Sequence, residues 1–171
     1  ANGIREEHSV GRVRFDLVIP EATDSLSRSK TETKLGEFFS GEQCYTKFAE
    51  AGIQYGPTFR VLESVEVSNG LATCNLALSD SIQRTTGDFT LHPSLIDGGL
   101  QGMIALEGEN LQGALPFTVE RVEVFHSCPP TCQSLIQRSP CQEAPHGILK
   151  HDIEWRDSAG KMFVRMSGYS T

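Results

Sequence analysis

The stretch from Leu91 to Leu106 constrains the fold of this chain more than any other. It opens with a His-Pro pair and continues with apolar residues at three-to-four-residue spacing, which predicts one long apolar helix. Gly98, Gly99 and Gly102 each cost such a helix about 1 kcal/mol relative to alanine. Because this cost needs a reason, we expect the helix backbone to approach a sheet or a ligand closely.

Two polar residues, Asp97 and Gln101, interrupt this apolar pattern. They are four positions apart and therefore share one face of the predicted helix. Burying a carboxylate and an amide among apolar side chains is costly unless they have a partner or a task. The pair is the candidate site of chemistry. The alternative is a core helix in which Asp97 anchors a neighbouring loop.

Length and charge limit the possible classes of protein. With 171 residues, the chain is long enough for a single domain over residues 1–171 with its own core. Its net charge of −7 argues against binding to nucleic acid or to a membrane surface. No apolar run is long enough to span a membrane, and residues 1–8 show no secretory pattern. These features predict a cytoplasmic protein.

The cysteines give little sign of a metal site. The five are unevenly spaced and form no Cys-x-x-Cys pair. A zinc site that uses Cys128, Cys132, Cys141 and a histidine is conceivable, but the spacing favours reduced thiols. We therefore expect no metal and no cofactor.

Alternating apolar residues and turn signals predict six or seven antiparallel strands. Asn69-Gly70 is a strong hairpin signal, Ser40 and Gln43 form a capping box, and Gly52 ends the short helix that this box begins. Residues 21–37 are predicted to be an exposed connection. An antiparallel sheet packed on one apolar helix is an α+β arrangement. The predicted strands cover residues 11–20, 61–67, 71–78, 119–125, 134–138, 148–155 and 161–169.

Three motifs then follow one another in a familiar order. Gly52–Phe59 fits Gly-Tyr-x-Tyr-Gly-Pro-x-Phe, His92–Gln101 fits His-Pro-x-x-x-Asp-x-x-x-Gln, and 115–117 reads Leu-Pro-Phe. Together, across residues 38–169, they resemble the dehydratase domain of modular polyketide synthases, a double-hotdog fold, and specifically its C-terminal hotdog. The resemblance implies a hotdog fold, in which an antiparallel sheet wraps around one long central helix.

The resemblance also implies an activity. Such domains remove water from a β-hydroxyacyl chain tethered through phosphopantetheine to an acyl carrier protein, and they leave an enoyl thioester. Asp97 would be the general acid, and Gln101 would orient it. An aspartic acid at its reference pKa of about 3.9 is ionised at neutral pH, so burial must raise the pKa of Asp97. No cofactor is implied. The implied substrate-binding residues are Tyr55, Gly56, Pro57, Phe59, His92, Pro93, Leu115, Pro116 and Phe117.

The chain departs from the family pattern in three respects. Ile53 replaces the first tyrosine of its motif, and Val119 stands where a tryptophan is common. No histidine of the chain has the spacing His-x-x-x-Gly-x-x-x-x-Pro, which belongs to the N-terminal hotdog. Residues 1–10 resemble the end of that preceding hotdog. The catalytic histidine is therefore expected from a missing N-terminal hotdog half, or the chain pairs with a second copy of itself.

Two other histidines need separate interpretation. His92 could act as a base beside Asp97, but a histidine that holds the loop by hydrogen bonds is the favoured interpretation. His151 alternates with Leu149 and Ile153 on an apolar strand face, which favours a satisfied core or interface histidine.

Three functions remain open on the sequence. The first is the catalytic-acid half of a dehydratase. The second is a non-catalytic hotdog that serves as a scaffold or as a carrier-protein docking module. The third is a stand-alone single-hotdog thioesterase, hydratase or isomerase. The Asp97/Gln101 pair favours the first over the second, and the absent histidine motif predicts that the isolated chain is inactive. The acyl chain, its stereochemistry and the oligomeric state stay open.

Overall fold

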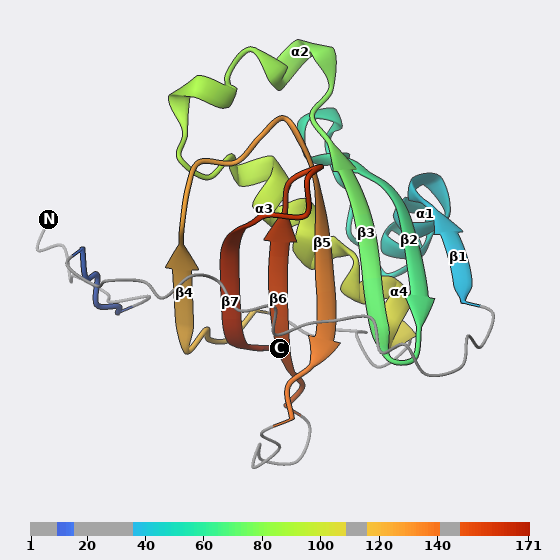
Figure 1. Cartoon of the computed structure of the whole chain (residues 1–171). Helices are drawn as coiled ribbons and strands as arrows, with labels where there is room; N and C mark the ends of the chain where they lie inside the picture. Colours follow the sequence, from blue (N-terminus) through green and yellow to red (C-terminus); the bar gives the residue numbers. More distant parts are fainter. Residues whose placement is uncertain (1–9, 16–35, 109–115, 141–147) are drawn as a thin grey trace, which may run out of the picture.

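The structure, a computed structural model, describes residues 10–15, 36–108, 116–140 and 148–171. Seven strands form one antiparallel sheet in the order β1-β2-β3-β5-β6-β7-β4. Figure 1 shows α3 and α4 crossing one face of this sheet. This is the predicted α+β arrangement. The elements are β1 (Glu37–Ser40), α1 (Gly41–Glu50), η1 (Pro57–Phe59), β2 (Leu62–Ser68), β3 (Leu71–Ala77), α2 (Asp80–Gln83), η2 (Thr86–Asp88), α3 (Pro93–Gln101), α4 (Met103–Glu107), β4 (Arg121–Val124), β5 (Thr131–Arg138), β6 (Lys150–Arg156) and β7 (Met162–Ser170).

Local sequence signals set the first helix and the first hairpin. The Ser40 hydroxyl accepts the Gln43 N–H at 3.2 Å, and the Gln43 side chain accepts the Ser40 N–H at 2.8 Å. This is the predicted capping box. Gly52 follows the helix with a φ of 85°, as the predicted C′ glycine should. Asn69 and Gly70 both have positive φ in the turn between β2 and β3, which confirms the hairpin.

The glycines of the central helix lie against the sheet, as predicted. A Cβ on Gly98 would lie 2.4 Å from Val61, and one on Gly99 would lie 2.2 Å from the Trp155 indole nitrogen. That nitrogen donates a hydrogen bond to the Leu95 carbonyl at 3.1 Å. The helix can therefore approach β6 this closely because Gly99 carries no side chain.

The prediction of one continuous central helix was wrong at Gly102. This residue separates α3 from α4 and has a φ of −58° and a ψ of −19°. Its carbonyl accepts the Ala105 N–H in a tighter, 3₁₀-type turn. A Cβ on Gly102 would lie 2.1 Å from the Cys74 sulfur on β3, so the turn tightens where the helix meets the sheet.

The predicted strand over residues 11–20 is not formed in its described part. Residues 10–15 have no regular secondary structure, and Phe15 is 95% exposed. The alternation of apolar residues is present, but no described strand pairs with it. Residues 16–35 lie outside the description. The predicted connection over 21–37 also ends early, because β1 begins at Glu37 and pairs with β2.

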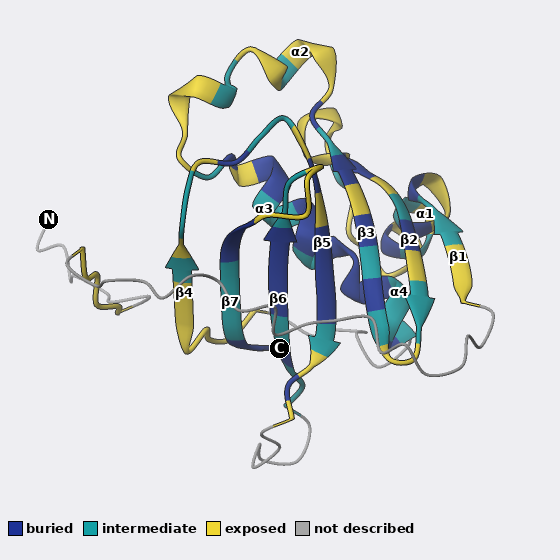
Figure 2. Ribbon diagram, viewed as in Figure 1, coloured by how far each residue is buried: buried dark blue, intermediate teal, exposed yellow. Residues whose placement is uncertain are grey.

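The two edges of the sheet differ from its centre in burial. Figure 2 shows β5 and β6 largely buried, whereas β1 and β4 carry exposed residues. Among the described strands, β4 pairs with β7 alone. Its Val122 and Val124 are exposed apolar side chains. Within the described residues, one edge of the sheet therefore presents a strand with a single partner and exposed apolar side chains.

No described helix is both long and apolar enough to cross a membrane.

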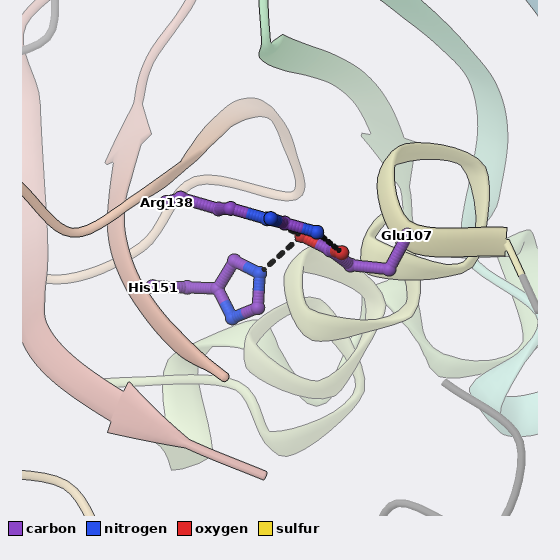
Figure 3. A network of polar contacts seen from close by, with 3 residues as sticks. All are labelled: Glu107, Arg138 and His151. Carbon is purple, nitrogen blue, oxygen red and sulfur yellow. Dashed lines mark hydrogen bonds and ion pairs between the residues drawn. The ribbon is translucent and has the colours of Figure 1, made fainter. Parts of the chain in front are cut away.

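A buried polar network ties the end of the central helical layer to the sheet (Figure 3). Glu107, at the end of α4, accepts from Arg138 Nε at 2.8 Å and lies 2.9 Å from His151 Nε2. A second Arg138 nitrogen also contacts the carboxylate. The Glu107 and His151 side chains are fully buried, whereas that of Arg138 is 48% exposed. His151 is thus a core histidine, as predicted, but it is satisfied at Nε2 alone, because its buried Nδ1 has no hydrogen-bond partner among the described residues.

Candidate active site

The candidate acid and its neighbour meet on α3 as the spacing predicts. Gln101 Nε2 donates a hydrogen bond to Asp97 Oδ2 at 2.8 Å. Asp97 is half-buried, and burial raises the pKa of its carboxyl, while the hydrogen bond from Gln101 opposes part of that rise. The carboxyl group therefore holds its proton to a higher pH than an exposed aspartic acid does, as a general acid requires.

Gln101 itself is almost fully buried and uses both ends of its amide. Its Nε2 also donates to the Phe59 carbonyl at 2.9 Å, and its Oε1 accepts from the Tyr45 hydroxyl at 2.9 Å. The Tyr45 hydroxyl in turn accepts the Leu62 N–H at 2.9 Å. Gln101 thus connects α3 with α1, η1 and β2.

The charge of Asp97 acts on all three tyrosines of the chain. Burial raises the pKa of Tyr45 and of Tyr55 to about 12, and the charge of Asp97 adds to both rises. Burial also raises the pKa of Tyr169 on β7, again with a contribution from Asp97. At neutral pH the three phenols are therefore protonated and uncharged.

The Gly52–Phe59 motif brings its aromatic residues to this site. The Tyr55 ring packs edge-on against Phe48, with ring centroids 5.0 Å apart, and against Tyr45 at 5.9 Å. Gly56 caps η1, and the carbonyl of Phe59 reaches Gln101. The motif therefore places Tyr55 and Phe59 at the candidate site. An open hollow of about 230 Å³ beside them is lined by Tyr45, Ala49, Ile53, Gln54, Tyr55 and Arg60.

His92 is a structural cap in this arrangement. Its Nδ1 accepts the Ser94 N–H at the start of α3, and its Nε2 lies 3.0 Å from the Thr85 hydroxyl. The Thr85 proton goes to the Ile82 carbonyl, so Nε2 carries a proton and donates. Burial lowers the pKa of His92. Both nitrogens of a neutral ring are engaged, which argues against His92 as a base.

The remaining predicted site residues lie less centrally. Pro93 is the exposed first residue of α3. Leu115 lies outside the described residues. Pro116 is exposed, and Phe117 donates its N–H to the Ser170 carbonyl at 2.9 Å, while its side chain is 77% exposed. The described part of the Leu-Pro-Phe motif therefore joins the end of β7 but directs its phenyl ring to the surface.

The predicted zinc alternative finds no cluster in the part of the chain that the structure describes, where no three metal-binding side chains meet. Cys128 and Cys132 are buried free thiols, and Cys141 lies outside the described residues. Burial raises the pKa of Cys132 to about 12, so its thiol stays protonated. The described cysteines therefore behave as core residues.

Sequence interpretation missed Tyr45 and Tyr169. Tyr45 falls in the short helix that the capping box begins, and Tyr169 falls in the predicted strand over residues 161–169, so neither stands out in the sequence. A tyrosine in an apolar stripe needs a partner for its hydroxyl, which was the available signal for Tyr45. The partner itself, Gln101, lies 56 residues away and could not be read from the sequence.

The chain matches one protein-family model and several curated proteins, among them polyketide synthases. Residues 23–171 match the family model described as the polyketide synthase dehydratase N-terminal domain. The chain is 30% identical to polyketide synthase PksM of Bacillus subtilis over 170 residues, which is 95% of this chain and 4% of that protein. It is 34% identical to PksN of the same organism over 129 residues, covering 70% of this chain and 2% of that protein.

Solved dehydratase structures share the fold. A trans-AT PKS dehydratase domain from Brevibacillus brevis has a TM-score of 0.72 and 29% identity, covering 79% of this chain and 48% of that chain. The dehydratase domain of RzxB from Pseudomonas fluorescens has a TM-score of 0.71 and 27% identity, covering 85% and 53%. The chain thus spans about half of these solved chains and a few per cent of the synthases. These matches show that it belongs to the polyketide synthase dehydratase domain family and has the hotdog fold of that family.

Proposed function

We propose that this chain is the half of a dehydratase domain that supplies the general acid, Asp97, for dehydration of β-hydroxyacyl thioesters on an acyl carrier protein. The observation that carries the proposal is the half-buried Asp97 carboxyl, whose pKa is raised by burial and whose Oδ2 accepts a hydrogen bond from Gln101. Burial outweighs the opposing hydrogen bond from Gln101 and favours the protonated acid that the reaction requires.

In the proposed dehydration, the β-hydroxyacyl thioester loses its α-proton and its β-hydroxyl. A base supplied from outside this chain removes the α-proton, and that electron pair forms the carbon–carbon double bond. The carbon–oxygen bond at the β-carbon breaks, and the hydroxyl leaves as water with the proton of Asp97. The resulting Asp97 carboxylate keeps the hydrogen bond from Gln101, which stabilises its new charge. Transfer of the α-proton from the base to the Asp97 carboxylate then restores the base and the acid for the next turnover.

We assign the chain to the C-terminal hotdog of the domain. The matching family model carries the name of the N-terminal domain, whereas our assignment rests on the motif that contains Asp97 and Gln101. No histidine in the sequence has the spacing expected of the N-terminal base. The chain also covers 48% of a solved dehydratase chain, which leaves room for a second half of similar size.

We further propose that the N-terminal hotdog pairs with the chain at β4. In the described part of the chain, β4 is an edge strand with β7 as its one partner and with exposed Val122 and Val124, and such an edge favours pairing with another strand. The similar size of the unmatched half in the solved structures makes that half the fitting occupant. A second copy of this chain is the competing outcome.

The first test is activity of the isolated chain. We expect no dehydration of a carrier-bound β-hydroxyacyl substrate by residues 1–171 alone, and loss of water once the N-terminal hotdog is present. Mass spectrometry of the carrier-bound chain reports this directly. Robust turnover by the isolated chain, abolished by His92→Ala, would instead indicate a stand-alone single-hotdog enzyme. A complete domain that binds the carrier protein without turnover would indicate a docking module.

The second test concerns Gln101. In the complete domain, Gln101→Ala removes the hydrogen bond that orients Asp97 and should lower kcat by about tenfold, the worth of one hydrogen bond of about 1.4 kcal/mol. The loss should be smaller than that of Asp97→Asn. Gln133→Ala is the matched control, because this exposed amide bonds to Asn75 on the sheet surface. Full activity of the Gln101 variant would contradict the assignment.

A further inference from the structure

A chain of three hydrogen bonds runs from β2 to the candidate acid, and a fourth branches from it to the Phe59 carbonyl. The Leu62 N–H donates to the Tyr45 hydroxyl at 2.9 Å, and that hydroxyl donates to Gln101 Oε1 at 2.9 Å. The Gln101 amide nitrogen then donates to the Phe59 carbonyl at 2.9 Å and to Asp97 Oδ2 at 2.8 Å. Three elements that are distant in sequence, α1, β2 and α3, thus meet in one polar chain.

Two backbone groups fix the direction of these bonds. A backbone N–H can only donate and a carbonyl can only accept. Because the Tyr45 oxygen accepts from Leu62, its one proton is available to Gln101 Oε1, while the Phe59 carbonyl lies at a longer 3.5 Å from the same hydroxyl. The Phe59 carbonyl needs a donor and receives it from the amide nitrogen. The Gln101 amide therefore has one favourable orientation, with its nitrogen toward Asp97.

We infer that Tyr45 is a positioning residue that holds the Gln101 amide so that Asp97 is hydrogen-bonded at Oδ2 and keeps its acidic proton on Oδ1. Within the described part of the chain, Oδ1 has no hydrogen-bond partner. It is the oxygen left to protonate a departing hydroxyl. The inference rests on the proposed function of Asp97 as the acid and adds a residue from outside the three motifs.

Loss of the Tyr45 hydroxyl would remove this control. With no donor at Oε1, the Gln101 amide can rotate and turn its oxygen toward Asp97. A carboxylic acid facing that oxygen would donate its proton to Gln101, and the proton would no longer be available to the substrate. The hydrogen bond that favours the Asp97 carboxylate would also be lost, which raises the pKa of Asp97.

Tyr45→Phe removes the hydroxyl and keeps the aromatic ring. The ring packs against Tyr55, with centroids 5.9 Å apart, and lies under the Arg60 guanidinium at 4.6 Å. Phenylalanine keeps both contacts. The other ionisable groups coupled to Asp97, Tyr55 and Tyr169, are unchanged. Any change at Asp97 therefore reports the loss of the hydroxyl.

The experiment uses the complete dehydratase domain. We expect Tyr45→Phe to lower kcat by about tenfold, one hydrogen bond's worth, with little change in KM. The alkaline limb of the pH–kcat profile should move to higher pH, because an acid with a raised pKa stays protonated longer. Carboxylate-resolved NMR of Asp97 in wild type and variant measures the same shift without any substrate.

A double-mutant cycle identifies the route of the effect. If Tyr45 acts through Gln101, Tyr45→Phe should cost less than about twofold in a Gln101→Ala background. Thr46→Ala is the matched control on the same helix, since its exposed hydroxyl bonds to the Glu42 carbonyl, and it should leave kcat and the pH limb unchanged. A full tenfold loss in the Gln101→Ala background, or an unshifted Asp97 pKa, would overturn the inference. A wild-type domain without dehydratase activity would overturn the proposed function, while the NMR comparison would still decide the role of Tyr45.

Discussion

Asp97→Asn in the complete dehydratase domain is expected to reduce kcat by about 10²–10⁴, the usual contribution of a positioned general acid. Asparagine keeps the size of the side chain, and its oxygen can still accept the hydrogen bond from Gln101. It has no acidic proton to give to the departing hydroxyl. Mass spectrometry of the carrier-bound product measures the loss. Asp88→Asn, at an exposed carboxylate in η2, is the matched control and should retain full activity.

The same substitution should not cost stability at neutral pH. Burial raises the folded-state pKa of Asp97 above its ordinary value of 3.8. The stability that the protonated carboxyl group adds to the fold is therefore fully present below that value and is lost as pH rises through the raised pKa. Asparagine is neutral at every pH and avoids the cost of a half-buried carboxylate. At pH 7 we therefore expect Asp97→Asn to unfold at the same or a higher temperature than wild type. A clear loss of thermal stability would mean that the Asp97 charge has a stabilising partner.

The features that the sequence predicted correctly are those that depend on neighbours in the chain. The hairpin at Asn69-Gly70 follows from residues that tolerate positive φ, and the capping box of Ser40 and Gln43 closes within four residues. Asp97 and Gln101 share a face because helical spacing requires it. The three glycines of the helix predicted that its backbone would approach a sheet or a ligand closely, although not which strands it would contact.

The features that the sequence could not predict depend on distant partners. The apolar alternation from Val13 to Phe15 resembles a strand, but a strand needs a neighbour, and β1 at Glu37–Ser40 takes the place beside β2. The break at Gly102 follows from the packing of the helix against Cys74. Tyr45 acquires its role only when β2 and α3 close around its hydroxyl. Each of these outcomes is decided by tertiary contact and not by local propensity.

The second large effect is expected at the opposite end of the helical layer. Glu107→Ala should lower the free energy of unfolding at pH 7 by about 3 kcal/mol, the lower part of the range for breaking a buried ionic network. The fully buried His151 loses its partner, whereas Arg138, at 48% exposure, can turn toward solvent. Gln133→Ala is the control, since its exposed amide bonds to Asn75 on the sheet surface and its loss should change the free energy of unfolding by about 0.5 kcal/mol or less. Denaturant unfolding of the complete domain measures both.

The pH dependence of this effect distinguishes the network from simple loss of packing. The hydrogen bond from Arg138 is the main cause that lowers the pKa of Glu107 below its ordinary value of 4.5. The Glu107 carboxylate therefore stabilises the fold above that pH, and this stabilisation is lost as pH falls through the lowered pKa. The stability difference between wild type and Glu107→Ala should therefore narrow below about pH 4.5. Asp97 shows the opposite dependence, because partial burial raises the pKa of its carboxyl. A Glu107 difference that stays constant from pH 7 to pH 3 would mean that the side chain contributes through its packing and not through its charge.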